Sequence, residues 1–323
     1  MEVGQTLLGI SNLSIRYKTE LGVVRAVEGL NLSLNVGETL GCVGETGAGK
    51  TTMALGIMGL IPSPPGYVES GEILFQGVNL LTLDEDRMNA VRGGKIAMIF
   101  QDPMTSLNPV MTIESQIAEM VSLHTELQGQ KVVQRARELM ELVGIRSERG
   151  IEYPHQFSGG MRQRVIIAIA LACSPILLIA DEPTTALDVT IQAQVLEMMK
   201  DLKQRLKTSM ILITHDLGVV ADCCDKVAIM YAGRVVEQGA MDKLFSGPVH
   251  PYTLGLFDSL PPLKGPKDDL KTIPGLMPDP TRLPPGCPFH PRCTYAVKSC
   301  SIEAPVMRTV KDDHHVACHV CAN

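Results

Sequence analysis

Residues 44–51, with the sequence GETGAGKT, have the residue types and spacing of a phosphate-binding loop. The pattern is G-x4-G-K-[ST], in which glycines let successive backbone N–H groups point at phosphate oxygens. Lys50 is expected to reach the β- and γ-phosphates of a nucleotide, and the Thr51 hydroxyl to bind Mg²⁺. A buried strand at 38–43 and a helix at 51–60 flank the loop, which favours this interpretation over a chance glycine-rich turn and adds a positive helix end. The predicted nucleotide contacts here are Gly44, Glu45, Thr46, Gly47, Ala48, Gly49, Lys50, Thr51 and Thr52.

Two acidic residues follow a second apolar strand, predicted at 176–180. Asp181 ends this strand and is placed to hold Mg²⁺ directly or through water. Glu182 faces the other way and is expected to orient or deprotonate an attacking water. An ordinary solvated loop is the alternative, but Pro183 and Thr184 redirect the chain at once. The segment therefore has the form of a Walker B strand.

The elements that must position these residues alternate between strands and helices. Strands are predicted at 7–17, 23–36, 210–214, 227–231 and 234–238, and apolar residues recur at helical spacing between 112 and 145. Eleven of the 21 prolines lie between 261 and 323, where helical periodicity largely disappears. We predict one domain at 1–258, with a helical subdomain at about 103–170, and a second domain at 259–323.

Composition limits the function classes. The formal charge of −6 argues against nucleic-acid binding, which requires an excess of Lys and Arg. Residues 1–5 lack the basic start of a signal peptide. The longest apolar stretch, 165–180, is interrupted by Pro175 and is better interpreted as buried helix, turn and buried strand than as a membrane span. These features predict a cytosolic chain whose thiols stay reduced.

Further motifs resemble those of ABC-type ATPases. Residues 157–164 are similar to the family's signature motif, 100–103 to its Q-loop, 186–188 to its D-loop and 214–216 to its switch-histidine segment. Order and spacing match over residues 6 to about 240. The signature departs from the usual pattern, since Phe157 and Met161 replace Leu and Gln, but the helix N-terminus that would bind a γ-phosphate is retained.

The resemblance implies a fold class and further site residues. The expected fold is α/β: a mixed sheet with a RecA-like core, an antiparallel β subdomain and a helical subdomain, followed by a small proline- and cysteine-rich domain. Glu182 becomes the general base and His215 the sensor of the γ-phosphate, with ATP and Mg²⁺ as cofactors. Tyr17 is expected to stack on adenine, although a half-exposed strand tyrosine is the alternative. The other implied contacts are Gln101, which also reaches Mg²⁺, Ser158, Gly159, Gly160 and Asp188.

The motifs occur once each, and this implies a partner. In the family, ATP lies between the P-loop of one subunit and the signature of another, so this chain must pair with itself or with a homologous ATPase. Residues 101–109, 161–164, 250–253, 273–275 and 284–287 resemble the oligopeptide/dipeptide and nickel importer branch. That likeness implies two transmembrane permease subunits, an extracytoplasmic substrate-binding protein, a peripheral position on the cytoplasmic membrane face, and import of di- or oligopeptides.

The sequence is also compatible with other functions. Nickel or another small solute is an alternative cargo. A soluble ABC ATPase of DNA repair or translation is disfavoured because the chain has neither a long coiled-coil insertion nor two ATPase units. Export is disfavoured because exporters often fuse the ATPase to membrane segments.

Five of the nine cysteines lie within residues 287–321. Cys287, Cys293, Cys300 and Cys318 are separated by five, six and 17 residues, which is wider than the short C-x2–4-C pairs of zinc sites. Four cysteines are the usual ligands of a [4Fe–4S] cluster. The importer ATPases that this chain resembles include members with such a cluster in the C-terminal region, so the resemblance also favours it. Zn²⁺ is the runner-up, with Cys321 or a histidine (His290, His314, His315 or His319) as a competing ligand, and free thiols are a third reading. We expect a structural centre that stabilises a small domain.

Overall fold

The computed structural model describes residues 4–102, 106–185, 187–259, 272–311 and 313–321. These form two compact units: the described residues of unit 1 lie within 4–5, 35–37 and 82–213, and those of unit 2 lie within 6–34, 38–81 and 214–321. Three parts of the sequence predictions lie outside the described residues: Pro103 of the Q-loop, Ala186 of the D-loop, and 260–271 at the start of the C-terminal region.

Unit 1 is built around parallel strands and a group of helices. Strand β7 (Leu177–Asp181) pairs with β6 (Ile96–Ile99) on one side and β8 (Ser209–Thr214) on the other. All three strands are buried along their whole length, as expected for parallel strands covered on both faces. This arrangement places the C-terminal ends of β6 and β7, and with them Gln101 and Glu182, at one sheet edge.

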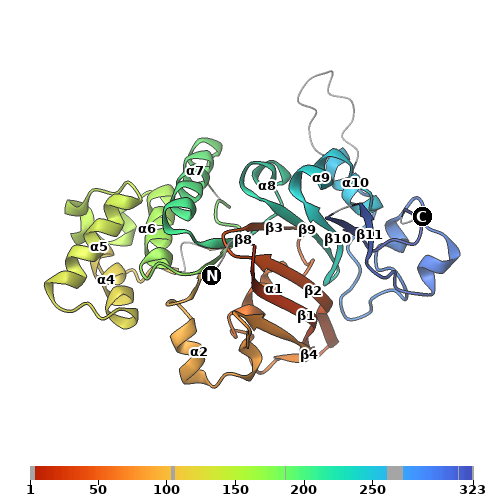
Figure 1. Cartoon of the computed structure of the whole chain (residues 1–323), viewed down its shortest axis with the longest axis horizontal. Helices are drawn as coiled ribbons and strands as arrows, with labels where there is room; N and C mark the ends of the chain where they lie inside the picture. Colours follow the sequence, from red (N-terminus) through yellow and green to blue (C-terminus); the bar gives the residue numbers. More distant parts are fainter. Residues whose placement is uncertain (1–3, 103–105, 186, 260–271, 312, 322–323) are drawn as a thin grey trace. The chain divides into compact units, whose positions relative to one another are not determined.

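The helices of unit 1 begin at side-chain caps. Thr112 caps α4 (Ile113–His124), Ser158 caps α6 (Gly159–Leu171) and Asp188 caps α7 (Val189–Leu206). Helix α5 (Gln130–Leu142) lies beside α4, and both lie next to α6 (Figure 1). Helix α2 (Glu85–Val91), capped by Asp84, completes the unit.

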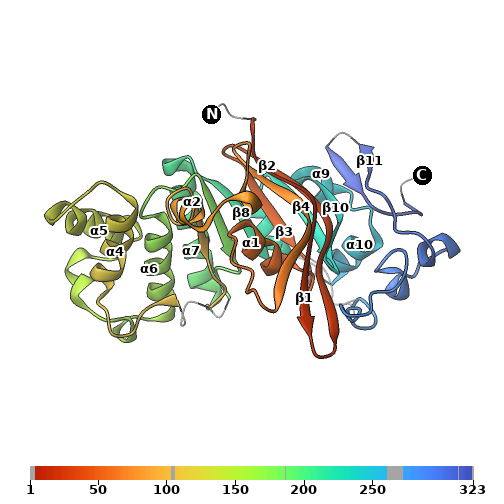
Figure 2. The ribbon, with the colours of Figure 1, turned by 90° about the horizontal axis from the view of Figure 1, so that it is seen from below.

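Unit 2 contains an antiparallel sheet of order β2-β1-β4-β5, visible as the long strands in Figure 2. The strands are β1 (Thr6–Thr19), β2 (Gly22–Asn35), β4 (Gly66–Phe75) and β5 (Val78–Asn79). Their inner faces bury Leu13, Ile15 and Ile73 completely, so one face of the sheet forms a core.

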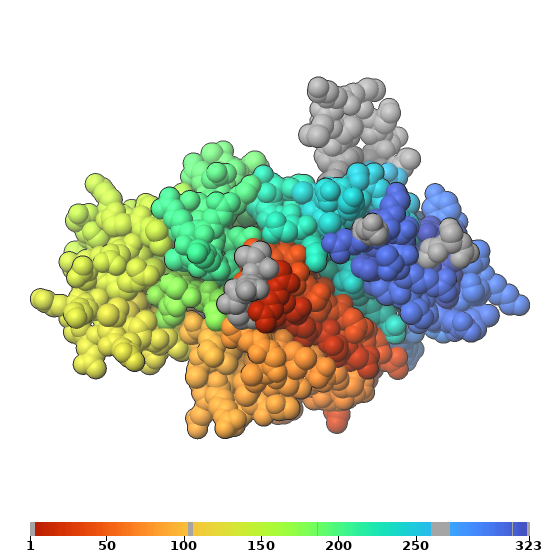
Figure 3. Space-filling view, in the orientation of Figure 1, coloured from red at the N-terminus to blue at the C-terminus, as the bar shows by residue number. Residues whose placement is uncertain are grey.

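Unit 2 also contains a mixed sheet, because β9 (Lys226–Tyr231) is parallel to β3 (Thr39–Val43) but antiparallel to β10 (Arg234–Ala240). The C-terminal strands β12 (His314–Val316) and β11 (Arg308–Lys311) extend it beyond β10. Its helices are α1 (Lys50–Ile57), α8 (Leu217–Cys223), α9 (Met241–Ser246) and α10 (Pro251–Asp258). The C-terminal residues pack against the segment that carries α9 and α10 (Figure 3).

The α/β prediction is confirmed, and the predicted strands that flank the phosphate loop and the two acids are present. Strands β4, β5, β6, β11 and β12 were not predicted, since glycine at 66 and 71 obscures the pattern of β4 and the other four are short. No helix among the described residues is both long and apolar enough to cross a bilayer.

Candidate nucleotide site

The loop between β3 and α1 has a shape that requires glycine at two positions. A Cβ atom at Gly44 would lie 2.2 Å from the Met230 carbonyl oxygen, and one at Gly49 would lie 2.3 Å from the Ala26 carbonyl oxygen. Gly49 also has φ of 96°, in the left-handed region. The loop is therefore held closely between the backbones of β9 and β2, which fixes the direction of its N–H groups.

Lys50 is the first residue of α1, and its side chain folds back into the loop. Its Nζ donates hydrogen bonds to the carbonyl oxygens of Gly44, at 2.6 Å, and Glu45, at 3.0 Å. The residue is 7% exposed, so its ammonium lies in a poorly solvated position beside the loop. Both acceptors are neutral, and phosphate oxygens are stronger acceptors for an ammonium group. Thr51 is exposed at the same helix start.

The two acids behind β7 differ in environment. Asp181 is the last residue of β7 and is 1% exposed, whereas Glu182 is half-buried. Glu182 has φ of 47°, an uncommon conformation for a residue with a side chain, and its N–H donates to the Ile213 carbonyl at 2.9 Å. The hydrogen bond holds this strained backbone conformation, which turns the Glu182 side chain away from the direction of β7.

Gln101 and Thr185 hold the Glu182 carboxylate. Gln101 Nε2 donates to Oε2 at 3.0 Å, and Thr185 Oγ1 donates to the same oxygen at 2.9 Å. The predicted Q-loop glutamine and the predicted general base are thus in direct contact. Thr185 was not singled out from the sequence; its position three residues after Glu182 in a turn was the available signal.

The predicted signature residues lie at the exposed N-terminus of α6. Ser158 caps the helix by accepting from the Met161 N–H at 3.4 Å, and Gly159 is exposed. A Cβ at Gly160 would lie 2.4 Å from the Ile191 side chain of α7, so glycine is needed for the two helices to approach. Asp188 caps α7 by accepting from the Ile191 N–H at 2.9 Å. Unit 1 therefore brings Ser158, Gly160 and Asp188 to one pair of helix starts.

Arg149 accounts for the two departures in the signature. Its guanidinium lies over the Phe157 ring, 4.5 Å from the centroid, and its Nη1 contacts Met161 Sδ at 3.2 Å. Phe157 is 3% exposed. The residues that replace Leu and Gln are therefore both in contact with Arg149 at the start of α6.

The remaining predicted residues belong to unit 2. His215 directly follows β8 and is exposed. Tyr17, near the end of β1, is half-buried and pairs with Gly66, where a Cβ would lie 2.8 Å from its ring. Unit 2 thus contains the loop 44–51, Tyr17 and His215, whereas Gln101, Asp181, Glu182 and the signature belong to unit 1.

Glu45 makes contacts that sequence reasoning missed. Its N–H donates to the Tyr252 hydroxyl at 2.9 Å, and its carboxylate accepts from Arg292. Tyr252 lies in a segment that the sequence marked by its resemblance to the importer branch, and Arg292 lies between Cys287 and Cys293 of the cysteine-rich region.

The C-terminal cysteines lie near one another but do not form a metal site in the described residues. Burial, reinforced by the thiols of Cys300, Cys318 and Cys293, raises the pKa of Cys287 to about 11. Burial and the neighbouring Cys318 raise the pKa of Cys321 to about 11. Among residues that the structure describes, however, no three His, Cys, Asp or Glu side chains are placed to hold a metal ion. The described residues therefore do not support the predicted [4Fe–4S] or zinc ligand set: the thiols lie near one another, but they are not arranged as metal ligands.

The four tail histidines have other partners. His314 Nε2 bonds Glu237 at 2.7 Å, His290 Nδ1 bonds the Cys287 carbonyl at 2.9 Å, and His319 Nε2 bonds the Glu303 carbonyl at 2.9 Å. His315 Nδ1 bonds Thr309 Oγ1 at 3.0 Å. Each ring therefore has a nitrogen engaged in organising the C-terminal segment.

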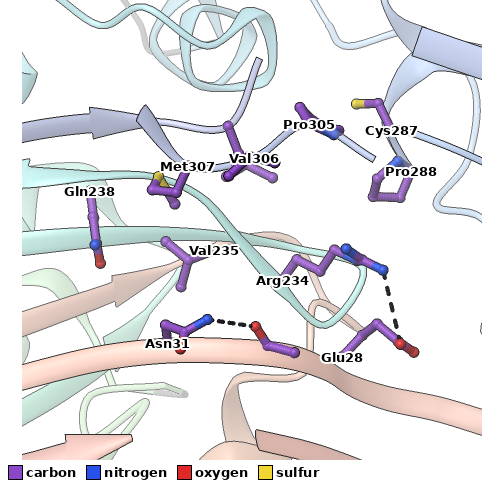
Figure 4. Close-up of a pocket in the computed structure, with 13 residues that line it drawn as sticks. Glu28, Asn31, Arg234, Val235, Gln238, Cys287, Pro288, Pro305, Val306 and Met307 are labelled. Carbon is purple, nitrogen blue, oxygen red and sulfur yellow. Dashed lines mark hydrogen bonds and ion pairs between the residues drawn. The ribbon is translucent and has the colours of Figure 1, made fainter. Parts of the chain in front are cut away.

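A cavity of about 270 Å³ lies beneath this segment (Figure 4). Pro305, Val306 and Met307 lie on one side, and residues of β10 and β2 lie on the other. An Arg234–Glu28 ion pair, 3.9 Å long, stands at its wall. The C-terminal segment therefore lies over β2, the strand whose Ala26 carbonyl packs closely against Gly49 of the phosphate loop.

These features, a glycine-wedged phosphate loop, an acid pair after a buried strand and a capped signature helix, define an ABC-type ATPase. The family model for the ABC transporter matches residues 27–185, and that for the oligopeptide/dipeptide transporter C-terminal region matches 236–300. The dimeric ATP-binding cassette MJ0796, solved in a post-hydrolysis state with ADP and Pi, superimposes with a TM-score of 0.66 at 26% identity, covering 72% of this chain and 98% of that one.

Relatives of full length narrow the class. The oligopeptide transport ATP-binding protein OppD of Bacillus subtilis is 53% identical over 313 residues, 96% of this chain and 87% of that protein. OppD of Haemophilus influenzae is 50% identical over 305 residues, 94% of each chain. The chain belongs to the oligopeptide transport ATP-binding protein family of ABC ATPases.

His250, which caps α10 beneath Tyr252, should make the protein acid-sensitive. It is 1% exposed, its Nδ1 accepts from the Tyr252 N–H at 3.1 Å, and burial lowers its pKa from 6.5 to about 4. The native state then binds fewer protons than the unfolded state, so the stability that the neutral His250 contributes is lost as pH falls from about 6.5 towards 4. His250→Asn keeps a capping acceptor without titrating. In urea unfolding, the free energy of unfolding of the wild type should fall by about 2 kcal/mol more than that of the variant between pH 7 and pH 5. An equal fall in both proteins would contradict the assignment.

Proposed function

We propose that this chain hydrolyses ATP to power the import of di- or oligopeptides through a membrane permease. The observation that carries the proposal is the loop 44–51, with Lys50 Nζ already held at the carbonyls of Gly44 and Glu45 and the backbone wedged against β2 and β9. The printed names of the relatives, oligopeptide transport ATP-binding proteins, support the cargo class.

Each predicted site residue has a proposed role. Glu182 is the general base, and Gln101, which contacts it, links the base to nucleotide and Mg²⁺. Thr51 and Asp181 hold Mg²⁺, His215 positions the γ-phosphate and Tyr17 stacks on adenine. Ser158, Gly159 and Gly160 supply a helix N-terminus to the γ-phosphate, with Asp188 beside them.

A second ATPase subunit completes the site. The signature lies at an exposed helix start, which suits contact with nucleotide held by another subunit. The similar cassette MJ0796 is described as dimeric with ADP and Pi, which supports this arrangement. ATP then joins two subunits through its γ-phosphate, and hydrolysis releases them.

We further propose two permease subunits, an extracytoplasmic binding protein that acts through them, and a peripheral position on the cytoplasmic face. The division into 1–258, with a helical subdomain at 103–170, and 259–323 belongs to the same proposal.

Gentle detergent purification tests the transport role. The tagged chain, expressed with its own membrane proteins, should retain integral membrane subunits and show ATPase activity that rises when a peptide-loaded binding protein is added. A chain that purifies free of membrane proteins, or with nucleic acid or ribosomes, would instead indicate the soluble class of ABC ATPase.

We also propose that Cys287, Cys293, Cys300 and Cys318 hold a [4Fe–4S] cluster that stabilises the C-terminal segment. The proximity of these thiols supports it, since burial and then the neighbouring thiols raise the pKa of Cys287 and Cys293, and so does the wide spacing in sequence. Zinc is the runner-up ligand, with Cys321 as an alternative fourth thiolate. A bound centre would add folding energy to a segment with little apolar surface.

Purification without oxygen tests the cysteine proposal. The expected result is a brown protein with about four irons per chain, lost together with most C-terminal protease resistance in Cys293→Ser. Cys173→Ser, which changes a half-buried cysteine of unit 1, is the control and should keep the colour. One zinc per chain would establish the runner-up, and a metal-free, protease-resistant tail would refute both.

A further inference from the structure

Glu45 brings a negative charge into a loop that is built to receive phosphate. Its carboxylate is about one-third exposed, and it is the second residue of the loop whose glycines are wedged against β2 and β9. A carboxylate in this position repels the several negative charges of a nucleoside triphosphate. The loop therefore needs a nearby cation in addition to Lys50.

Arg292 supplies this cation from the C-terminal segment. Its Nη1 lies 3.1 Å from both Glu45 oxygens, and its side chain is only 7% exposed. The other groups to which it donates hydrogen bonds are neutral: Nε donates to the Pro274 carbonyl at 2.8 Å, Nη1 to the Tyr231 hydroxyl at 3.4 Å and Nη2 to the Ile273 carbonyl at 3.4 Å. Since burial raises the pKa of Tyr231, that hydroxyl stays protonated. Glu45 is thus the charged partner that balances the buried guanidinium.

A cluster of three aromatic side chains packs around Arg292 and Glu45. Tyr231, Tyr252 and Phe289 pack with ring centroids 4.7–5.4 Å apart. Tyr252 accepts the Glu45 N–H, whereas Phe289 and Arg292 lie between Cys287 and Cys293 in the sequence. The backbone N–H and the carboxylate of one loop residue are therefore both held by residues from outside the loop.

We propose that Arg292 is a positioning residue of the nucleotide site, which neutralises and orients Glu45 so that the loop accepts the polyphosphate of ATP. The order of the C-terminal segment then sets the affinity of the phosphate loop within the same chain. This inference rests on the proposed ATP binding at residues 44–51, but it does not depend on what the cysteines bind.

Titration of the purified full-length chain with fluorescent ATP and ADP analogues, with Mg²⁺, tests the inference. Arg292→Ala should raise the dissociation constant for ATP by about 5- to 20-fold, and that for ADP by less, because the repulsion grows with phosphate charge. Arg292→Lys keeps the cation and should lose less than about threefold. In steady-state assays KM should rise while kcat changes little. Arg282→Ala, an exposed arginine in the same segment, is the matched control.

The double variant Arg292→Ala/Glu45→Gln separates charge compensation from mere packing. Removing the uncompensated acid should restore ATP affinity to within about twofold of wild type. Glu45→Gln alone removes the charge that repels phosphate while Arg292 keeps its own, so it should bind ATP about two- to threefold more tightly, which keeps the test decisive if Arg292→Ala misfolds. Failure of the double variant to recover, or binding by Glu45→Gln that is no tighter than that of the wild type, would overturn the inference. If the wild type does not bind ATP, the proposed function itself fails.

Discussion

Glu182→Gln should lower the turnover of ATP by about 10²- to 10⁴-fold while ATP affinity stays within about threefold of wild type. The carboxylate is the group that would accept a proton from the attacking water, and glutamine cannot do so. Gln101 and Thr185 now donate to Glu182 Oε2 at 3.0 and 2.9 Å, and an amide oxygen can still accept these bonds. Binding and local structure should therefore survive the loss of the base.

The measurement is single-turnover hydrolysis with size-exclusion chromatography in ATP and Mg²⁺. The variant should accumulate as a closed pair of ATPase subunits, because in the proposed dimer the γ-phosphate that would join them is not removed. Glu119→Gln, on an exposed position of α4 in the same unit, is the control and should hydrolyse ATP normally. Rapid hydrolysis by Glu182→Gln would assign the base elsewhere.

Gly49→Ala should abolish measurable ATP binding, a loss of at least roughly 100-fold in affinity. The new Cβ would lie 2.3 Å from the Ala26 carbonyl oxygen, and the backbone is in the left-handed region at φ of 96°. Because the clash is with backbone, the loop itself must move away from β2, and its N–H groups move with it. Isothermal titration with ATP and Mg²⁺ checks the loss, and circular dichroism checks that the domain stays folded.

Gly47→Ala is the matched variant for that experiment. Gly47 has φ of 85°, but a Cβ there meets nothing within 4 Å. Only conformational strain remains, about 1–2 kcal/mol, so the loss of affinity should stay below roughly 10-fold. Equal effects of the two substitutions would show that strain, and not the wedge against β2, controls the loop.

The link between Arg292 and Glu45 gives the C-terminal segment a place in nucleotide binding. The residues concerned are 247 positions apart in sequence, and the sequence marked the C-terminal segment by its cysteines, its prolines and its resemblance to the importer branch, none of which predicts this contact. Acid conditions that protonate His250 would loosen α10, and with it the Tyr252 hydroxyl that holds the Glu45 N–H. The pH dependence of stability and the affinity of the loop should therefore respond to the same group of buried residues.

The sequence by itself determined the parts whose chemistry depends on local order. The loop at 44–51, the acid pair at 181–182 and the helix start at 158–160 could be predicted because a strand end, a glycine-rich turn and a helix cap are each specified within a few residues. The parallel strands β7 and β8 were evident for the same reason, since burial on both faces leaves a continuous apolar run.

Only the tertiary structure decided the contacts between distant segments. It placed Gln101 on Glu182, Arg149 behind Phe157 and Arg292 on Glu45, and it left the tail cysteines near one another without a metal-binding geometry among the described residues. No local pattern encodes such pairs, because a side-chain partner is chosen by packing and charge after the chain has folded. The residues that would perform the chemistry can thus be predicted from the sequence, whereas the residues that hold them in position are identified only by the tertiary structure.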